Sequence, residues 1–315
     1  MATERGVTMR KSPRVSIGMP VYNGEKTIAA ALASILQQTF NDFEVIISDN
    51  ASTDSTRKIA QEFCNADRRV RYSRNDKNLG AHPNFNRAFT LSQGEYFKWA
   101  HHDDTIAPDY LEKCVRVLDE DSSFVMCWTK GEYVDVDGVK VPHDEKPLKL
   151  DSNDVGVRFW EVLMESRTAD QIDGLIRRSA LEKTALMRPF VGAEKILLAE
   201  LIVQGRCKQI PEYLFFKGCS PEMYSLLKTE EAQKKWVSAT PNQMPAGLNY
   251  LLGYVKAVWH SPLSPRDFAK CCFALLNYTF GWNTWKSRLR RRRLGPGYSG
   301  SLTTSGRFEI GENRD

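Results

Sequence analysis

The residues with the most evident chemistry stand together at 101–104, where two histidines precede two aspartates in the stretch KWAHHDDTIAP. Imidazole and carboxylate groups in this arrangement can ligate a metal ion, move a proton or simply form the polar end of a strand. Two other polar clusters, PVYNG at 20–24 and SDNASTD at 48–54, also follow apolar runs. The three clusters can form one site only if the fold brings the ends of these runs together.

The side-chain types in HHDD leave several kinds of site open. Carboxylate oxygens suit a hard cation such as Mg²⁺ or Mn²⁺. A transition-metal site made by both histidines is the alternative, but adjacent residues of an extended strand point to opposite faces, so His101 and His102 are poorly placed to chelate one ion. A third interpretation is a solvated strand end at which Asp104 caps the following turn. The sequence has no GxGxxG and no GxxxxGK[ST], so a phosphate would be handled through a divalent cation.

The elements that must position these clusters alternate along the chain. Apolar runs rich in β-branched residues predict strands, and segments with apolar residues at helical spacing predict the helices between them. The predicted strands are at 14–22, 43–49, 69–75 and 95–101. The predicted helices are at 25–39, within 50–63 after capping residues, and within 77–94, where a loop precedes a helix that Gly94 ends. This order is typical of a doubly wound α/β sheet, in which ligands bind outside the carboxyl ends of the strands. The three polar clusters are therefore expected to form one site.

Composition and charge narrow the class of protein. The 315 residues are 42% hydrophobic and 26% charged, as in ordinary globular chains. The net charge of +5 comes largely from the run KSRLRRRRL at 286–294, so the rest of the chain is nearly neutral and nucleic acid is not an expected partner. Seven cysteines without a CxxC motif, no signal-peptide pattern and no run of 18 apolar residues predict a cytoplasmic protein without a membrane-spanning helix.

The motifs taken together resemble a known family. The segments VSIGMPVYNGEKTIAAALASILQQTFNDFEVIISDNASTDST, NLGAHPNFNRAF and GEYFKWAHHDDTIAPDYLEK are similar to the nucleotide-sugar-binding half of family 2 glycosyltransferases, inverting enzymes of the GT-A fold. The resemblance is nearly continuous over residues 13–130, and compatible features extend to about 220.

The resemblance implies an α/β fold of GT-A type, with a doubly wound, mostly parallel central sheet flanked by helices. The expected organisation is a flexible segment 1–12, a glycosyltransferase domain 13–220, a C-terminal helical extension 221–293 and a disordered Gly/Ser-rich tail 294–315. Within the domain, 13–130 would be the nucleotide-sugar-binding half and 131–220 the acceptor half.

The resemblance also implies roles for individual residues. Asp49 would accept a hydrogen bond from the nucleotide base, and Asp103 would hold the metal as the last acidic position of the family's DXD motif. The remaining residues expected to contact the nucleotide sugar are Pro20, Tyr22, Asn23, Asn78, Gly80 and His102. Gly80 has an independent reason to be there, because a turn that brings backbone close to a ligand favours a residue without Cβ.

The motif departs from the family pattern at one position. Where the family often has Asp-x-Asp-Asp, this chain begins with His101. A Mg²⁺ or Mn²⁺ ion can draw most of its ligands from water and substrate phosphates, so one protein carboxylate can suffice. His101 would then contact the donor's ribose or phosphate, or bind nothing.

Inverting transfer requires a general base, which the resemblance places in the second half of the domain. Glu194, in FVGAEKILLAEL, stands where the family usually has an Asp, and Asp173, in QIDGLIRRSAL, is the second candidate. A purely structural alternative for Glu194 is a carboxylate that favours the positive end of a helix. Glu200 is expected to be structural, and the pair at 177–178 would form salt bridges or neutralise a diphosphate.

The expected function is that of a metal-dependent, inverting, hexosyltransferase-like enzyme in glycan or polysaccharide assembly. It would move a sugar from a nucleoside-diphosphate sugar, expected to be a UDP-sugar, to a glycan or lipid-linked acceptor. The alternative is a catalytically degenerate nucleotide-sugar-binding or scaffold protein. The predicted C-terminal helices and the arginine run suit peripheral contact with the inner face of an anionic membrane, or else helices packed on the protein's own core before a solvated tail.

Overall fold

The computed structural model describes residues 12–134, 139–143, 147–166, 168–218, 229–281, 300–302 and 308–310. The arginine run at 286–294, the predicted flexible segment except its last residue, and most of the predicted tail lie outside these ranges. Within the tail, β10 (Gly300–Leu302) and β11 (Phe308–Ile310) form an antiparallel pair.

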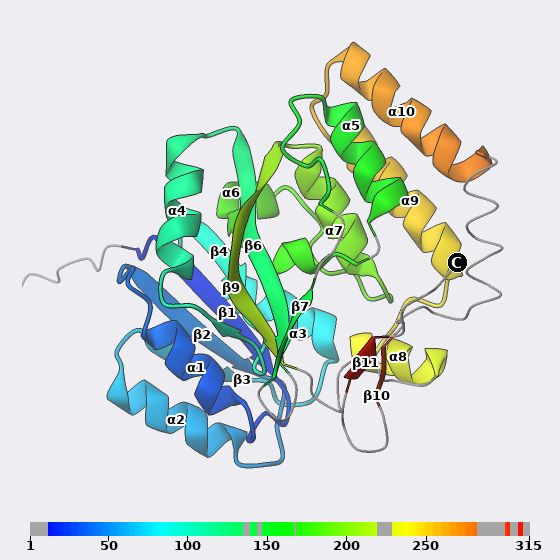
Figure 1. Ribbon diagram of the computed structural model, residues 1–315. Helices are drawn as coiled ribbons and strands as arrows, with labels where there is room; N and C mark the ends of the chain where they lie inside the picture. Colours follow the sequence, from blue (N-terminus) through cyan, green and yellow to red (C-terminus); the bar gives the residue numbers. More distant parts are fainter. Residues whose placement is uncertain are drawn as a thin grey trace, which may run out of the picture.

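The first half of the chain forms a four-stranded parallel sheet (Figure 1). Its strands in spatial order are β3 (Val70–Arg74), β2 (Phe43–Asp49), β1 (Val15–Val21) and β4 (Tyr96–Trp99). Each strand lies within a predicted strand segment. The connecting helices are α1 (Ile28–Leu36), α2 (Thr56–Ala66) and α3 (Ala81–Thr90). The predicted alternation of strand and helix is confirmed here.

The register of these strands brings the polar clusters together. Val21 at the end of β1 pairs with Asp49 at the end of β2, and Asp49 pairs in turn with Arg74 at the end of β3. β4 runs in the same direction beside β1, so the segment 101–104 follows the same edge of the sheet. Parallel pairing thus places all three clusters at one set of carboxyl ends.

The second half extends the sheet with mixed pairing. β8 (Leu175–Arg177) lies antiparallel to both β4 and β6 (Phe124–Val134), and β9 (Arg206–Gly218) runs parallel to β6. The remaining strands are β5 (Thr105–Ile106) on β9 and β7 (Lys140–His143) on β6. The helical elements here are α4 (Tyr110–Glu120), α5 (Val155–Trp160), η1 (Glu161–Glu165), η2 (Asp170–Asp173), α6 (Arg178–Leu181) and α7 (Ala193–Ile202).

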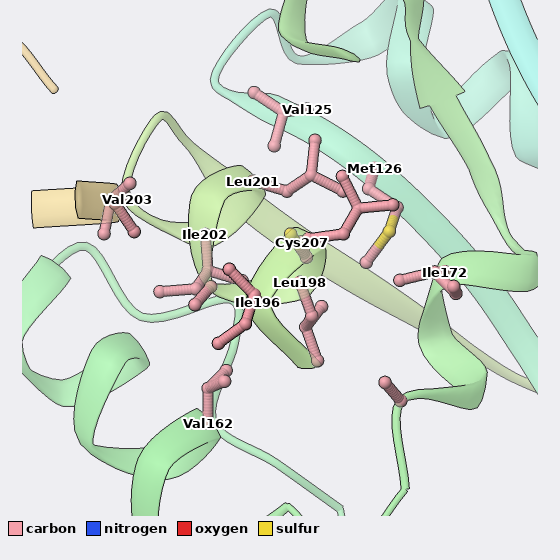
Figure 2. Packing of buried hydrophobic residues seen from close by; sticks show 14 of the residues in the cluster. Val125, Met126, Val162, Ile172, Ile196, Leu198, Leu201, Ile202, Val203 and Cys207 are labelled. Atoms are coloured by element: carbon pink, nitrogen blue, oxygen red, sulfur yellow. The ribbon is translucent and has the colours of Figure 1, made fainter. Parts of the chain in front are cut away.

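Helix α7 is the centre of the larger core cluster. It is apolar on nearly every side, as expected of a helix surrounded by protein. Figure 2 shows its side chains Ile196, Leu198 and Leu201 among Val125 and Met126 of β6. The backbone position of a residue at the start of α7 is therefore fixed by the packing of this helix in the core.

The predicted C-terminal helical extension is also present, as α8 (Glu230–Val237), α9 (Ala246–Trp259) and α10 (Pro265–Phe280) (Figure 1). α9 packs on α7 and α10 packs on α5. Tyr254 and Val258 of α9 and Cys271 of α10 are buried in the same cluster as α7. The extension thus shares its core with the rest of the fold, as one of the two sequence-based alternatives expects.

Two further features concern the described residues as a group. The six cysteines that the structure describes are all free of disulfides. Among the helices described, none has the length and apolar character needed to cross a bilayer.

Candidate active site

The loop after β1 is tied to the loop after β2. Asn23 adopts a left-handed conformation with φ 54°, its backbone N–H donates to Ser52 Oγ at 3.0 Å, and its Oδ1 accepts from the Thr53 N–H at 2.9 Å. Tyr22 beside it is 43% exposed, whereas Pro20 is buried within β1. Of these residues, Tyr22 has the most exposed side chain, and Asn23 fixes the conformation of the loop.

Asp49 is fully buried and already bonded within the protein. Its Oδ1 accepts from the Ser52 N–H at 2.8 Å and its Oδ2 accepts from the Tyr72 hydroxyl at 2.5 Å. Burial and the bond to Asp49 raise the pKa of Tyr72, so this hydroxyl keeps its proton and donates. The contact between Asp49 and a nucleotide base stays a prediction.

The predicted Asn-Leu-Gly turn is held by side-chain amides. Asn50 Nδ2 donates to Asn78 Oδ1 at 2.8 Å and to the Gly80 carbonyl oxygen at 3.0 Å. Asn75 Nδ2 donates to both Asn50 Oδ1 and Asn84 Oδ1. Because these amides sit between the ends of β2 and β3 and the start of α3, they fix the turn relative to the sheet.

Gly80 is required by both conformation and space. Its φ is +86°, and a Cβ there would lie 2.3 Å from the Cα of Ser238. Glycine is thus required in this turn by the positive φ and by the protein's own backbone at Ser238, and the predicted close approach of a ligand stays a prediction.

The two histidines of HHDD point to different partners, as the sequence predicted. His101 Nε2 lies 3.1 Å from Asp173 Oδ1, and His102 Nδ1 lies 2.9 Å from Thr27 Oγ1. Burial opposes the charged form of His101, but Asp173 outweighs it and raises the pKa of His101 to about 9. A site in which both imidazoles chelate one ion does not form.

A different group is placed for a cation. His101, Asp103 and Asp104 each offer a ligand atom, and these atoms all lie within 4.8 Å of one another. Asp104 Oδ1 accepts from the Gly218 N–H at 3.1 Å, but its Oδ2 is buried without a hydrogen-bond partner among the described residues. Burial raises the pKa of Asp104 to about 7. An orphaned buried oxygen beside a second carboxylate fits a divalent cation.

Asp173 lies beside this group on η2. It is 7% exposed, and its carbonyl oxygen accepts a hydrogen bond from Lys98 Nζ. Burial raises the pKa of the Asp173 carboxyl, but His101, Lys217 and Lys98 outweigh it, so the net pKa is lowered and the group is ionised. Lys217, which also pairs with Asp170 at 3.1 Å, is a cation that the sequence did not single out.

A pocket opens next to Asp173. It has about 820 Å³ of empty space, part of which is open to solvent, between β6, β9 and η2, and its walls include Trp128, Lys130, Glu132 and Lys217. Asp173 forms part of the wall of this pocket and also contacts His101 of the group placed for a cation. That its loop faces the acceptor stays a prediction.

Glu194 lies in the first turn of α7, two residues after Gly192, which has a left-handed backbone conformation. Gly192 has φ +82°, and a Cβ there would lie 1.8 Å from the hydroxyl oxygen of Tyr250. The Tyr250 hydroxyl donates to the Val191 carbonyl oxygen at 3.3 Å. The glycine that the sequence placed at this helix start is therefore needed for α9 to pack against it.

The Glu194 carboxylate contacts a histidine that sequence reasoning did not single out. His82 Nε2 lies 2.9 Å from Glu194 Oε1. Burial raises the pKa of Glu194, but the bond and charge of His82 outweigh it and the net pKa is lowered. Asp173 also acts electrostatically on Glu194, so the structure brings both predicted base candidates to one region.

The other charged residues considered in the sequence analysis form hydrogen bonds and ion pairs within the fold. Glu200 is buried and accepts from Arg188 Nη2 at 2.5 Å. Arg177 donates to main-chain carbonyls, including that of Phe124 at 2.8 Å, and Arg178 pairs with Glu182. The structural role expected for Glu200 is confirmed, and of the two alternatives for the pair at 177–178 the salt bridge is present at Arg178.

Solved structures with a similar fold span almost the whole chain. A structure of residues 1–349 of TarS from S. aureus in complex with UDP covers 96% of this chain and 98% of that one, with a TM-score of 0.55 and 17% identity. The mannosyltransferase PcManGT from Pyrobaculum calidifontis, in complex with GDP-Man and Mn²⁺, covers 91% of this chain and 77% of that one, with a TM-score of 0.55 and 16% identity. These similarities confirm the predicted GT-A type fold.

Sequence comparison identifies the family. The chondroitin synthase of Escherichia coli is 37% identical over 131 residues, 42% of this chain and 19% of that protein. The putative glycosyltransferase EpsE of Bacillus subtilis is 32% identical over 133 residues, 42% of this chain and 48% of that protein. The chain thus spans less than half the length of either relative. The model of the family "Glycosyl transferase family 2" matches residues 16–183, and the chain belongs to this family.

Proposed function

We propose that the protein is a metal-dependent, inverting glycosyltransferase. It moves a sugar from a nucleoside-diphosphate sugar, for which we propose a UDP-sugar, to a hydroxyl of a glycan or lipid-linked acceptor. The observation that carries the proposal is the meeting of three features at one end of the sheet. These are the Asn-Leu-Gly turn, the group formed by His101, Asp103 and Asp104, and the carboxylates Asp173 and Glu194. TarS structures with UDP and UDP-GlcNAc support a nucleotide-sugar donor.

The residues of the chain would bind the donor from two sides. Tyr22 and the turn at Gly80 border the nucleotide, while Asp103 and Asp104, with His101 beside them, hold the divalent cation, Mg²⁺ or Mn²⁺. When bound, such an ion stabilises the negative charge that develops on the leaving diphosphate. Lys217, whose pKa is raised because the surrounding carboxylates outweigh its burial, adds fixed positive charge next to this group.

Glu194 would accept the proton of the attacking acceptor hydroxyl. Its lowered pKa keeps the carboxylate ionised at neutral pH, as a general base must be before it reacts. Asp173 in the pocket wall would orient acceptor hydroxyl groups, and it is the second candidate for the base. A general base in this position contributes roughly 10² to 10⁴ in rate.

We further propose a cytoplasmic protein that contacts the inner face of an anionic membrane. Support comes from the outer faces of α9 and α10, where Trp259, Phe273 and Phe280 are 72%, 64% and 75% exposed. In the sequence, the arginine-rich run at 286–294 begins a few residues after the end of α10 at Phe280. Apolar side chains beside a basic segment suit a bilayer interface with anionic lipids.

The first experiment identifies the donor. A thermal-shift screen of nucleotide sugars, with and without Mn²⁺, should show one donor that raises the melting temperature in a Mn²⁺-dependent way, because a ligand that binds only the folded state stabilises it. With that donor, Asp103→Ala and Glu194→Gln should each abolish turnover while the fold survives. Wild-type turnover in both variants would refute the catalytic assignment, and donor binding without turnover in the native protein would favour the nucleotide-sugar-binding scaffold.

A further inference from the structure

His82 contacts the proposed base from a different part of the chain. It lies in the first turn of α3, two residues after Gly80, and is only 2% exposed. Its Nδ1 is 2.6 Å from the carbonyl oxygen of Arg188, and its Nε2 is 2.9 Å from Glu194 Oε1. Because both ring nitrogens are engaged, the orientation of the imidazole is fixed.

The partners of His82 determine where its protons are. A carbonyl oxygen can only accept, so Nδ1 carries a proton and donates it to Arg188. The contact between Nε2 and a carboxylate oxygen then requires a second proton between the two groups. Despite burial, the pKa of His82 is raised by the hydrogen bond and charge of Glu194, and that of Glu194 is lowered by His82, so this proton stays on Nε2 and the carboxylate is ionised. An acceptor proton would go to Oε2, because His82 engages Oε1.

We propose that His82 is a positioning residue that holds the Glu194 carboxylate in place to deprotonate the acceptor hydroxyl. The inference rests on the proposed function. Glutamate is one methylene longer than aspartate and has one more rotatable bond, whose freedom opposes a fixed geometry. The hydrogen bond at Oε1 removes this freedom at the far end of the side chain, while Gly192 sets the backbone end.

The same histidine connects the base to the donor side. His82 follows the Asn-Leu-Gly turn by two residues, and the Gly80 carbonyl is held by Asn50. The Arg188 carbonyl, which His82 also contacts, belongs to the segment that leads into α7. Loss of the imidazole should therefore misplace the base while the donor-binding turn keeps its amide contacts, and kcat should fall more than the KM for the donor rises.

The pH dependence follows from the groups that face Glu194. They are His82 from α3, Asp173 from η2 and Tyr250 from α9. Without the imidazole, burial and the negative charge of Asp173 remain, and both raise the pKa of Glu194. Because the base works only when deprotonated, the acid limb of the kcat/KM profile should move to higher pH.

Two variants at position 82 test the inference. His82→Leu should lower kcat about 10- to 100-fold, the cost of a misplaced reacting group, and shift the acid limb to higher pH. His82→Gln, whose amide nitrogen can replace Nε2 as a donor but carries no charge, should restore most of kcat and still show the shifted limb. Melting curves and donor affinity establish that each variant is folded.

The outcomes separate this inference from the proposed function. Full activity of Glu194→Gln would overturn the base assignment itself. Loss of activity in Glu194→Gln together with an unchanged kcat and pH profile in His82→Leu would overturn only the role of His82. If His82→Leu does not fold, His82→Gln, which keeps a hydrogen-bond donor, decides, because an unshifted acid limb in that variant contradicts the inference.

Discussion

At the residue scale, two buried aspartates of the site have opposite electrostatic surroundings. Asp173 is neighboured by His101, Lys98 and Lys217, which together lower its pKa despite burial. Burial dominates at Asp104 and raises its pKa to about 7, and its Oδ2 lacks a hydrogen-bond partner among the described residues. A cation would supply the partner that Asp104 Oδ2 lacks. Asp104 should therefore contribute to metal binding as well as Asp103.

This assignment predicts the effect of Asp104→Asn on metal affinity. The substitution preserves size and an oxygen for the Gly218 N–H but removes the charge, so Mn²⁺ binding should weaken about 10-fold or more. Mn²⁺ titration followed by electron paramagnetic resonance measures this without turnover. Asp109→Asn, at an exposed carboxylate paired with Lys113, is the matched control and should bind as the native protein does. Equal affinity in both variants would contradict the ligand role of Asp104.

Sequence patterns predicted the strands, and the meeting of the polar clusters at one edge of the sheet, better than the contacts between distant side chains. The strand at Phe43–Asp49 was predicted with its observed bounds, because a continuous apolar run between polar residues has few other structures available. His82 could not be paired with Glu194 in advance, since 112 positions separate them and only tertiary packing joins α3 to α7. The contact of Lys98 could not be predicted for a similar reason, because the carbonyl oxygen that it binds belongs to Asp173, in the second half of the domain.

At the element scale, a capping aspartate links the start of α5 to α10. Asp154 Oδ1 accepts from the Gly156 N–H at 2.8 Å, and its Oδ2 accepts from Lys270 Nζ at 2.7 Å. The bond to Lys270 is the largest influence and lowers the pKa of Asp154. One carboxylate thus satisfies a helix end and joins the C-terminal helix to the domain.

Asp154→Ala should destabilise the protein in a pH-dependent way. Loss of the cap costs about 0.5–2 kcal/mol at pH 7. The folded-state pKa of Asp154 is depressed, so its ionic contribution is present above the unfolded value near 3.9 and is lost as the pH falls through the folded pKa. Urea unfolding at pH 7 and at about pH 3 should show a smaller difference between variant and native protein at the lower pH. Asp151→Asn, at an exposed pair with Lys208, should change stability little at either pH.

At the scale of the whole molecule, the C-terminal helices have two different faces. Their inner faces join the core cluster around α7, while the outer faces carry Leu252, Trp259, Phe273 and Phe280 exposed. Leu252 and Trp259 on α9, and Phe273 and Phe280 on α10, are each seven residues apart and so lie on one face of their helix, and a contiguous apolar surface of this kind would mark a site of interaction. The helices therefore stabilise the domain and present the surface proposed to meet a bilayer.

A flotation assay tests the membrane proposal. The native chain should float with vesicles that contain anionic lipid and less with neutral ones, because cations near a charged surface contribute about 1 kcal/mol each. The triple variant Trp259→Ser, Phe273→Ser, Phe280→Ser should lose most of this binding while its melting temperature stays close to the native value. Val139→Ser, at an exposed apolar residue elsewhere, is the control and should float normally. Concentration-dependent dimerisation abolished by the triple variant, without vesicle binding, would instead identify a second copy as the partner.

The amides under the Asn-Leu-Gly turn give the two sides of the site different sensitivities to their surroundings. Asn50, Asn75, Asn78 and Asn84 hold the turn through neutral groups that neither gain nor lose a proton between about pH 4 and 10. The proposed cation site and the proposed base are built instead from histidine, lysine and carboxylate side chains. Acidification should therefore protonate Asp104, whose pKa is raised to about 7, and weaken cation binding, while the turn proposed to bind the donor keeps its shape and can bind again when the pH recovers.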